Sequence, residues 1–128
     1  MSRRILVTGS RDWKGSQGIR VIMRALRKEP SKSELIEGEA DGVDKMSRLV
    51  AECLGWRIYP VRADWKRYGL AAGPIRNREM LDMNPDYVYA FHSDIKKSKG
   101  TRDCIQEAKK RGIPGELIDY EGKVVDQW

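Results

Sequence analysis

Four short segments carry residue types that bind phosphate or sugar, and each follows directly after, or close to, a short apolar run. They are GSRDW at 9–13, GEADGVD at 38–44, GLAAGPIRNREM at 69–80 and FHSDIKKSKGTRD at 91–103. Glycine lets the backbone turn sharply and approach a ligand, and arginine pairs with phosphate oxygens. The chemistry that these residues favour is the binding of an anion rather than of a metal.

The first segment contributes Gly9, Ser10 and Arg11 as candidate ligand-binding residues. Backbone N–H groups beside a turn glycine can bond a phosphate or a ribose. A Walker-type ATPase loop is excluded, because it needs Gly-Lys-Ser/Thr in that order and this chain has Lys14-Gly15-Ser16. The alternative is a simple strand-to-helix turn with a solvent-facing arginine.

The second segment has two interpretations. Asp41 suits a helix N-cap, and Asp44, three residues later, favours the positive end of the same helix. In the functional interpretation, Gly38 and Gly42 leave room for a ligand while Glu39 accepts a ribose hydroxyl. Glu39 and Asp41 are therefore kept as candidate catalytic carboxylates, and Gly38 as a candidate ligand contact.

The third segment makes Arg76 the strongest single candidate, for ligand binding and for catalysis. Small residues up to Gly73 let a large group approach, and Arg76 and Asn77 follow in the first turn of a helix that we expect to begin at Pro74. Arg76 can pair bidentately with phosphate. The alternative role for Arg76 is a structural ion pair with a carboxylate at a strand end.

The fourth segment contains Gly100 and Thr101, a pair that opens a helix and offers a phosphate seat. His92 is the only histidine of the chain and follows the fourth expected strand directly. A single histidine is more often an ordinary loop residue, and we interpret it so.

Three aromatic residues near these segments, Trp13, Trp65 and Tyr68, offer a stacking face for a base, although packing is the commoner fate of an aromatic side chain. The two cysteines, Cys53 and Cys104, lack metal-ligand spacing and suit a reduced, cytoplasmic protein. We predict neither a metal site nor a cofactor.

Alternating apolar runs and amphipathic stretches predict the elements that position these segments. Strand-helix alternation implies an α/β three-layer sandwich, with a mostly parallel sheet of about five strands and helices on both faces. Ligands of such folds bind beyond the carboxyl ends of the strands, where all four segments fall. The expected strands are 5–8, 34–37, 56–61, 87–91 and 116–119, the expected helices are 16–28, 43–54, 74–82 and 100–111, a loop runs through Gly73, and the tail 120–128 receives no element.

Composition limits the partners. The chain has 128 residues, 40% of them hydrophobic and 34% charged, which predicts one globular domain over 1–128. No apolar run approaches the about 18 residues that cross a bilayer, and we see no signal peptide, so we expect no membrane partner and a cytoplasmic protein. The net charge of +6 suits an anionic partner, but its dispersal makes nucleic acid a less favoured one than a small nucleotide.

Taken together, the motifs VTGSRDW, GEADGVD, AGPIRN and KGT resemble those of the SLOG superfamily, and within it the small YspA-like family of bacteria and phages. The resemblance covers roughly residues 4–115. It implies a Rossmann-like fold, a nucleotide or nucleotide-derived ligand, and a homo-oligomer. The superfamily also contains DprA-type DNA-processing proteins, which keeps a nucleic-acid-binding module as an alternative.

A second alternative comes from the Lonely Guy phosphoribohydrolases of the same superfamily, which cleave the N-glycosidic bond of nucleoside 5′-monophosphates. By resemblance, Arg76 matches their arginine and Gly100-Thr101 matches the Gly-Thr of their motif. The motif's glutamate position is Cys104, and a neutral thiol cannot stabilise an oxocarbenium-like sugar or activate water. A hydrolase would therefore need Glu39 or Asp41 instead, so we separate ligand binding from catalysis.

Overall fold

A six-stranded sheet, in the order β3-β2-β1-β4-β5-β6, organises the computed structural model, which describes residues 2–128. The first five strands run parallel and β6 runs antiparallel to β5. The strands are β1 (Arg4–Gly9), β2 (Glu34–Glu37), β3 (Arg57–Pro60), β4 (Tyr87–Phe91), β5 (Gly115–Ile118) and β6 (Val124–Gln127).

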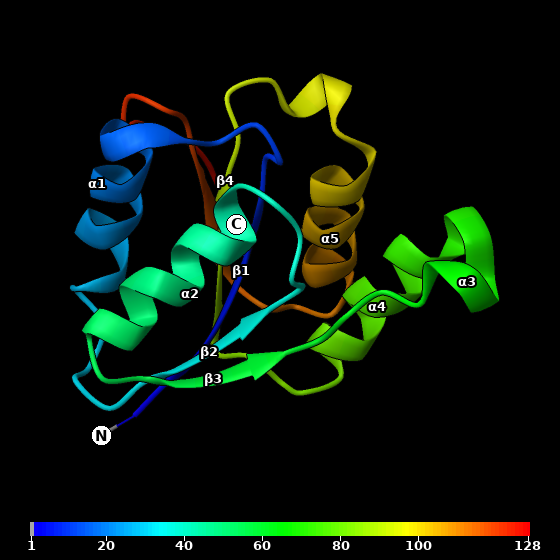
Figure 1. Ribbon diagram of the computed structural model, residues 1–128, viewed down its shortest axis with the longest axis horizontal. Helices are drawn as coiled ribbons and strands as arrows, with labels where there is room; N and C mark the ends of the chain where they lie inside the picture. Colours follow the sequence, from blue (N-terminus) through cyan, green and yellow to red (C-terminus); the bar gives the residue numbers. More distant parts are fainter. Residues whose placement is uncertain (1) are drawn as a thin grey trace.

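Helices cover both faces of this sheet (Figure 1). The pair α1 and α2 lies on one face, and α4 and α5 lie on the other. The helices are α1 (Gly15–Leu26), α2 (Val43–Cys53), α3 (Trp65–Tyr68), α4 (Ala72–Leu81) and α5 (Lys99–Lys110), with short 3₁₀ turns η1 (Gly69–Ala71) and η2 (Ile95–Lys97). None of these helices combines the length and apolarity that a bilayer crossing requires.

The alternation of β1 explains the three layers. Ile5 and Val7 are fully buried against α1 and α2, whereas Leu6 is fully buried against α4 and α5. Successive side chains of a strand point to opposite faces, so a strand with both faces apolar must be covered on both sides. The sequence-based prediction of an α/β three-layer fold is confirmed.

The strand order creates a crevice between β1 and β4. The chain leaves β1 toward α1 on one face and leaves β4 toward α5 on the other, although the two strands are neighbours. Loops that diverge in this way leave room beyond the strand ends, where doubly wound folds bind ligands.

One strand of the sheet was not predicted, and one expectation about the elements was wrong. The tail forms a sixth strand, which the pattern hides because all four residues of β6 are exposed and none alternates with a buried neighbour. The expected loop through Gly73 is a helical arm of α3 and η1, and Gly73 lies inside α4. The Asp64 side chain starts this arm by accepting a hydrogen bond from the Arg67 N–H at 3.1 Å.

Candidate functional site

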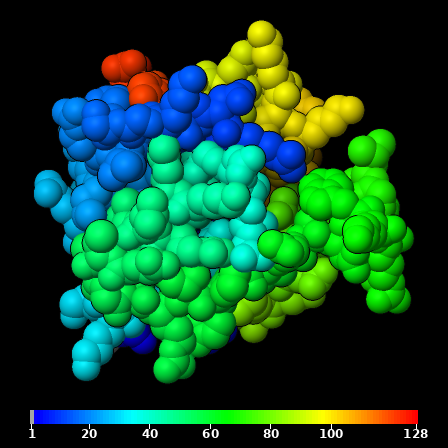
Figure 2. All heavy atoms as spheres, in the orientation of Figure 1, coloured from blue at the N-terminus to red at the C-terminus, as the bar shows by residue number. Residues whose placement is uncertain are grey.

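The main cleft, a cavity of about 490 Å³, lies at the carboxyl ends of β1 and β4. Figure 2 shows the β1–α1 loop in blue, the α3 arm in green and the segment before α5 in yellow around this edge of the molecule. Of the predicted site residues, those that line the main cleft are Gly9, Ser10, Arg11, Gly73, Arg76, Asn77, Gly100 and Thr101.

A side cleft of about 330 Å³ adjoins the main cleft. Arg11, Trp65 and Arg76 line both, so the two cavities share a wall. The remaining predicted site residues, Gly38, Glu39 and Asp41, line only the side cleft. The fold thus brings all four sequence segments to one edge of the sheet but divides them between two cavities.

Arg76 is 9% exposed and forms part of the shared wall. Its Nη1 donates to the Gly38 carbonyl oxygen at 2.6 Å, and its Nε donates to Asn77 Oδ1 at 3.2 Å. Among residues 2–128, no carboxylate oxygen forms a salt bridge with this guanidinium, and Nη2 has no hydrogen-bond acceptor. The alternative of a structural ion pair is wrong, and one donor group of Arg76 stays available.

Gly38 makes the position of Arg76 attainable. A Cβ atom at Gly38 would lie 2.8 Å from Arg76 Cζ, so any side chain there would displace the guanidinium. Glycine is therefore required at this position for close packing with Arg76, a role that differs from the predicted ligand contact.

Asn77 links Arg76 to the start of α5. Its Oδ1 accepts from Arg76, while its Nδ2 donates to the Gly100 carbonyl oxygen at 3.1 Å and to Asp103 Oδ2 at 3.0 Å. Both ends of the amide are used inside the protein. Asn77 thus fixes the geometry of the cleft, and sequence reasoning found the residue without its partners.

Asp44 is the buried carboxylate of the main cleft, which the exposed Asp12 also lines. Asp44 is 6% exposed, and its Oδ2 accepts hydrogen bonds from the N–H groups of Gly38 at 3.1 Å and Ala40 at 3.2 Å. Burial raises the pKa of Asp44 to about 7, against the opposing effect of the nearby Arg76. The sequence pattern indicated only a stabilising role for Asp44 at the positive end of the helix. The only sequence signal for a role in the cleft was its place in the GEADGVD segment.

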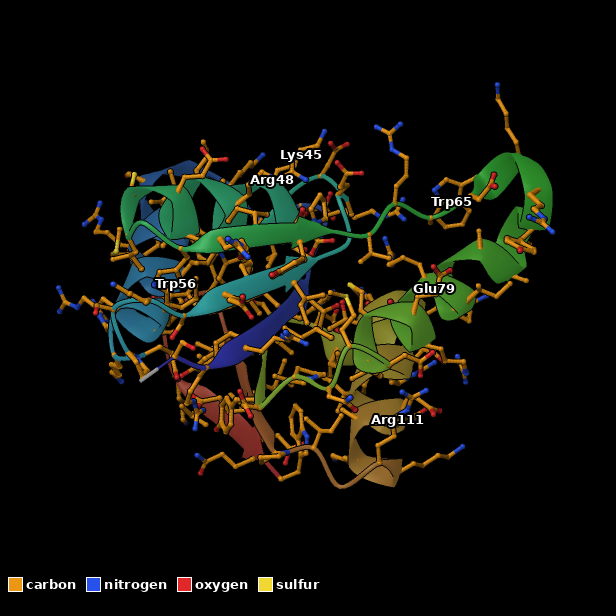
Figure 3. All side chains as sticks on the ribbon, turned by 90° about the horizontal axis from the view of Figure 1, so that it is seen from below. Lys45, Arg48, Trp56, Trp65, Glu79 and Arg111 are labelled. Carbon is orange, nitrogen blue, oxygen red and sulfur yellow. The ribbon has the colours of Figure 1, made fainter. Side chains whose placement is uncertain are left out.

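Glu39 has a left-handed backbone, with φ of 59°, and its carboxylate is bound by two arginines. Oε1 accepts from Arg48 Nη2 at 3.0 Å, and Oε2 lies 3.4 Å from Arg62 Nε. The hydrogen bond from Arg48 lowers the pKa of Glu39, so this group is an ionised ion-pair partner. Figure 3 shows Arg48 on α2, close to the adjoining strands.

Asp41 does not cap α2. The N-cap residue is Gly42, without a side-chain hydrogen bond, and the exposed Asp41 carboxylate pairs with Lys45 Nζ at 2.8 Å. The N-cap expectation was wrong because Gly42, at φ of 75°, turns the chain between Asp41 and the helix.

The first segment approaches β4 closely. A Cβ atom at Gly9 would overlap the Phe91 carbonyl oxygen and lie 2.7 Å from Val43 Cγ2. The Ser10 N–H donates to the same carbonyl oxygen at 2.9 Å. Contrary to the expectation from the sequence, this amide is therefore not available to a phosphate. Arg11 is exposed, and its Cζ lies 5.7 Å from the centre of the Trp65 ring.

The fourth segment opens α5 one residue earlier than expected. Ser98 is the N-cap and accepts a hydrogen bond from the Thr101 N–H at 3.1 Å, and the helix begins at Lys99. Within the described chain, the N–H groups of Lys99 and Gly100 have no acceptor. A Cβ atom at Gly100 would meet nothing within 4 Å. The start of α5 is therefore open to an anion.

The aromatic candidates separate by burial. Trp13 belongs to the core, with its Nε1 donating to the Gly18 carbonyl oxygen at 3.0 Å, and cannot stack on a ligand. Trp65 is 46% exposed, and Figure 3 shows its ring on the side of the arm that faces the rest of the molecule. Tyr68 is exposed but lines neither cleft.

His92, interpreted from sequence as an ordinary loop residue, lines the main cleft. Its Nδ1 accepts a hydrogen bond from the Asp94 N–H at 2.9 Å, and burial lowers the pKa of the imidazole. The sequence feature that could have placed His92 in the site was its position directly after β4.

The first two motifs of this edge lie within a match to a known protein family. Residues 3–68 match the family described as the YspA, cpYpsA-related SLOG family. The chain belongs to this SLOG family. It is also 36% identical over 127 residues to the Gene 61 protein of Mycobacterium phage D29, covering 94% of this chain and 98% of that protein.

The SLOG chain also resembles a solved structure, DNA processing protein A (DprA) from Streptococcus pneumoniae. The TM-score is 0.67 over 91% of the SLOG chain at 18% sequence identity. The SLOG chain spans half the length of the DprA chain. At this identity the similarity shows a shared fold and says nothing of shared chemistry.

Cys104 of the SLOG chain stands where the resemblance to phosphoribohydrolases places a glutamate. Cys104 is fully buried and lines neither cleft, and burial raises the pKa of its thiol to about 12. In residues 2–128, no group of three or more metal-ligating side chains is close enough to hold a metal ion.

Proposed function

We propose that this SLOG protein binds a nucleotide or nucleotide-derived phosphorylated ligand in the main cleft. The observation that carries the proposal is the pairing of two unused donor sets around one cavity. Arg76 Nη2 lies on one side, and the amides of Lys99 and Gly100 lie at the start of α5. Both favour an anion with several oxygens.

The rest of the cavity suits the other parts of such a ligand. The side chains of Lys97 and Lys99 add positive charge beside the start of α5. Trp65, in the shared wall, offers a partly exposed ring against which a base can stack. We place the phosphate between Arg76 and α5, and the base toward the arm.

Binding is tested by isothermal titration calorimetry and thermal shift with the four nucleoside 5′-monophosphates. A ligand of the native state raises the melting temperature by mass action. Arg76→Ala is expected to weaken binding at least about tenfold, because a charge-assisted contact is lost. Arg78→Ala is the matched control: Arg78 lies on the same helix, is exposed and lines neither cleft.

Arg76 is buried, so its removal can also weaken the fold. Arg11→Ala provides an independent test, because Arg11 is exposed and yet lines both clefts. The circular dichroism spectrum shows whether each variant is folded. Unchanged affinity in folded Arg76→Ala and Arg11→Ala, or no binding of any of the four nucleotides, would contradict the proposal.

A second candidate ligand is a nucleic acid strand, which the DNA-processing role in DprA's name also suggests. Exposed basic side chains lie on both sides of the main cleft: Lys96, Lys97, Lys99 and Arg102 around α5, and Lys66 and Arg67 on the arm. Fluorescence anisotropy with a single-stranded oligonucleotide at rising salt tests it. Strand binding predicts that the logarithm of the affinity falls linearly with the logarithm of the salt concentration. Absence of oligonucleotide binding by a protein that binds a nucleoside 5′-monophosphate would contradict it.

The phosphoribohydrolase alternative has less support. Glycoside cleavage needs a carboxyl group at the sugar, and of the two carboxylates predicted for this role, Glu39 is paired with two arginines and Asp41 is exposed outside the main cleft. Chromatography of the nucleotide after incubation with the protein tests for a released base. Release of the base by the wild-type protein, and its loss in Glu39→Gln or Asp41→Asn, would support this alternative.

A further inference from the structure

Asp44 is a buried acid in the wall of the main cleft whose two oxygens differ in use. Oδ2 accepts the N–H groups of Gly38 and Ala40, whereas Oδ1 accepts no hydrogen bond from any residue in 2–128. The loop therefore holds the carboxyl group by one oxygen and leaves the other toward the cavity that it lines.

We propose that Asp44 contacts the bound phosphorylated ligand through Oδ1 and takes up one proton from solvent when that ligand binds. The inference rests on the proposed function, because it concerns the same cleft. It assigns the ligand-facing acid to Asp44 rather than to Glu39 or Asp41.

The groups around Asp44 explain the uptake. Arg76 faces it from α4 and favours the carboxylate, while the buried Glu37 of β2 favours the neutral acid. Cys104 of α5 is also near and is an uncharged thiol, since its pKa is raised to about 12. With burial included, the pKa of Asp44 is about 7 in the free protein.

A phosphate changes this balance in one direction. It adds negative charge beside Arg76 and competes with Asp44 for the same guanidinium, so the charged form of Asp44 loses its main support. A protonated Asp44 instead donates a hydrogen bond from Oδ1 to a phosphate oxygen. At pH 8 the free carboxyl is mostly ionised, so uptake should approach one proton per ligand.

Titration calorimetry at pH 8 in buffers of different ionisation enthalpy measures the uptake directly. The probe is whichever of the four nucleoside 5′-monophosphates binds most tightly. We expect the wild-type enthalpy to vary with the buffer ionisation enthalpy with a slope near one proton, and Asp44→Asn to give a slope near zero. Asp126→Asn, which changes an exposed carboxylate that lines neither cleft, should keep the wild-type slope.

Asp44→Asn imitates the protonated acid, because its amide oxygen still accepts from Gly38 and Ala40 and its NH₂ group faces the cleft. Wild-type affinity should fall about tenfold per pH unit above pH 7, whereas the affinity of Asp44→Asn should stay level. The melting temperature of each variant shows that it is folded.

The outcomes separate the two proposals. Nucleotide binding with a wild-type slope near zero, or with the same slope in Asp44→Asn, overturns the role of Asp44 and leaves the proposed function standing. Absence of binding heat for all four nucleotides overturns the proposed function, and the role of Asp44 with it.

Discussion

At the scale of single residues, the cleft depends on an arginine and a carboxyl group that are both buried and not directly paired. Arg76 donates hydrogen bonds to Gly38 and Asn77, and one oxygen of Asp44 accepts from backbone amides. A buried charge without a close counter-charge is costly to keep. Such a site stores unfavourable electrostatic energy that a ligand of the right charge can relieve.

The raised pKa of Asp44 makes stability depend on pH in a defined direction. Its pKa rises from 3.8 to about 7 on folding, so the folded state holds the proton more tightly, and this contribution is lost as pH rises through about 7. We expect Asp44→Asn to be more stable than wild type at pH 8. The advantage should shrink by about 1.4 kcal/mol per pH unit below about 7.

Urea denaturation at pH 5, 6, 7 and 8 measures this difference. Asp41→Asn is the control, because its exposed carboxylate should leave the pH profile near that of wild type. Parallel profiles for wild type and Asp44→Asn would show that Asp44 keeps an ordinary pKa in the folded protein.

At the scale of elements, two loops that border the clefts interlock. The Val43 N–H donates to the Ser10 carbonyl oxygen at 3.0 Å, which joins the β2–α2 loop to the β1–α1 loop. Gly42 lies at this contact with φ of 75°, and a Cβ atom there would overlap the Ser10 carbonyl oxygen and lie 2.7 Å from the Arg11 carbonyl carbon. The contact fixes Arg11 and Asp44 relative to each other.

Gly42→Ala should therefore combine backbone strain with a steric clash. We expect it to lower the free energy of unfolding by about 3 kcal/mol, from roughly 1–3 kcal/mol of backbone strain plus overpacking. Gly55→Ala is a matched control, since Gly55 has φ of 77° but open space around its Cβ position. It should cost only the strain. Equal urea midpoints for the two variants would contradict an interlocked pair of loops.

At the scale of the whole molecule, the C-terminal segment joins the sheet edge to α5. Trp128 exchanges two backbone hydrogen bonds with Gly115 at 3.1 Å, and its indole Nε1 donates to the Ile113 carbonyl oxygen at 2.9 Å. The ring packs against Gly115, where a Cβ atom would lie 2.9 Å from Trp128 Cε2. This packing extends the core beyond β5.

Trp128→Ala should lower the free energy of unfolding by about 2 kcal/mol. This is less than the loss expected for a fully buried tryptophan, because the Trp128 side chain is partly exposed. Val125→Ala, in the preceding strand β6 and 49% exposed, should change the free energy of unfolding by less than about 0.5 kcal/mol. Equal unfolding midpoints for the two variants in urea would show that the indole adds nothing to the core.

The order of the sequence determined the architecture and the edge that carries the site. Strand-helix alternation fixes a parallel sheet, and parallel strands bring their carboxyl ends together, so GSR, GEADGVD, AGPIRN and KGT had to converge. These inferences needed only the period of apolar residues and the places where it stops.

Only the tertiary structure decided which polar group does what at that edge. Arg76 meets Gly38 across 38 residues, Asn77 meets Asp103 across 26, and the pKa of Asp44 depends on Arg76 of α4 and Glu37 of β2. For the same reason, the sequence could not show which of Asp44, Glu39 and Asp41 faces the ligand. Hydrogen-bond partners and desolvation are set by neighbours distant in the chain, and no local pattern encodes them.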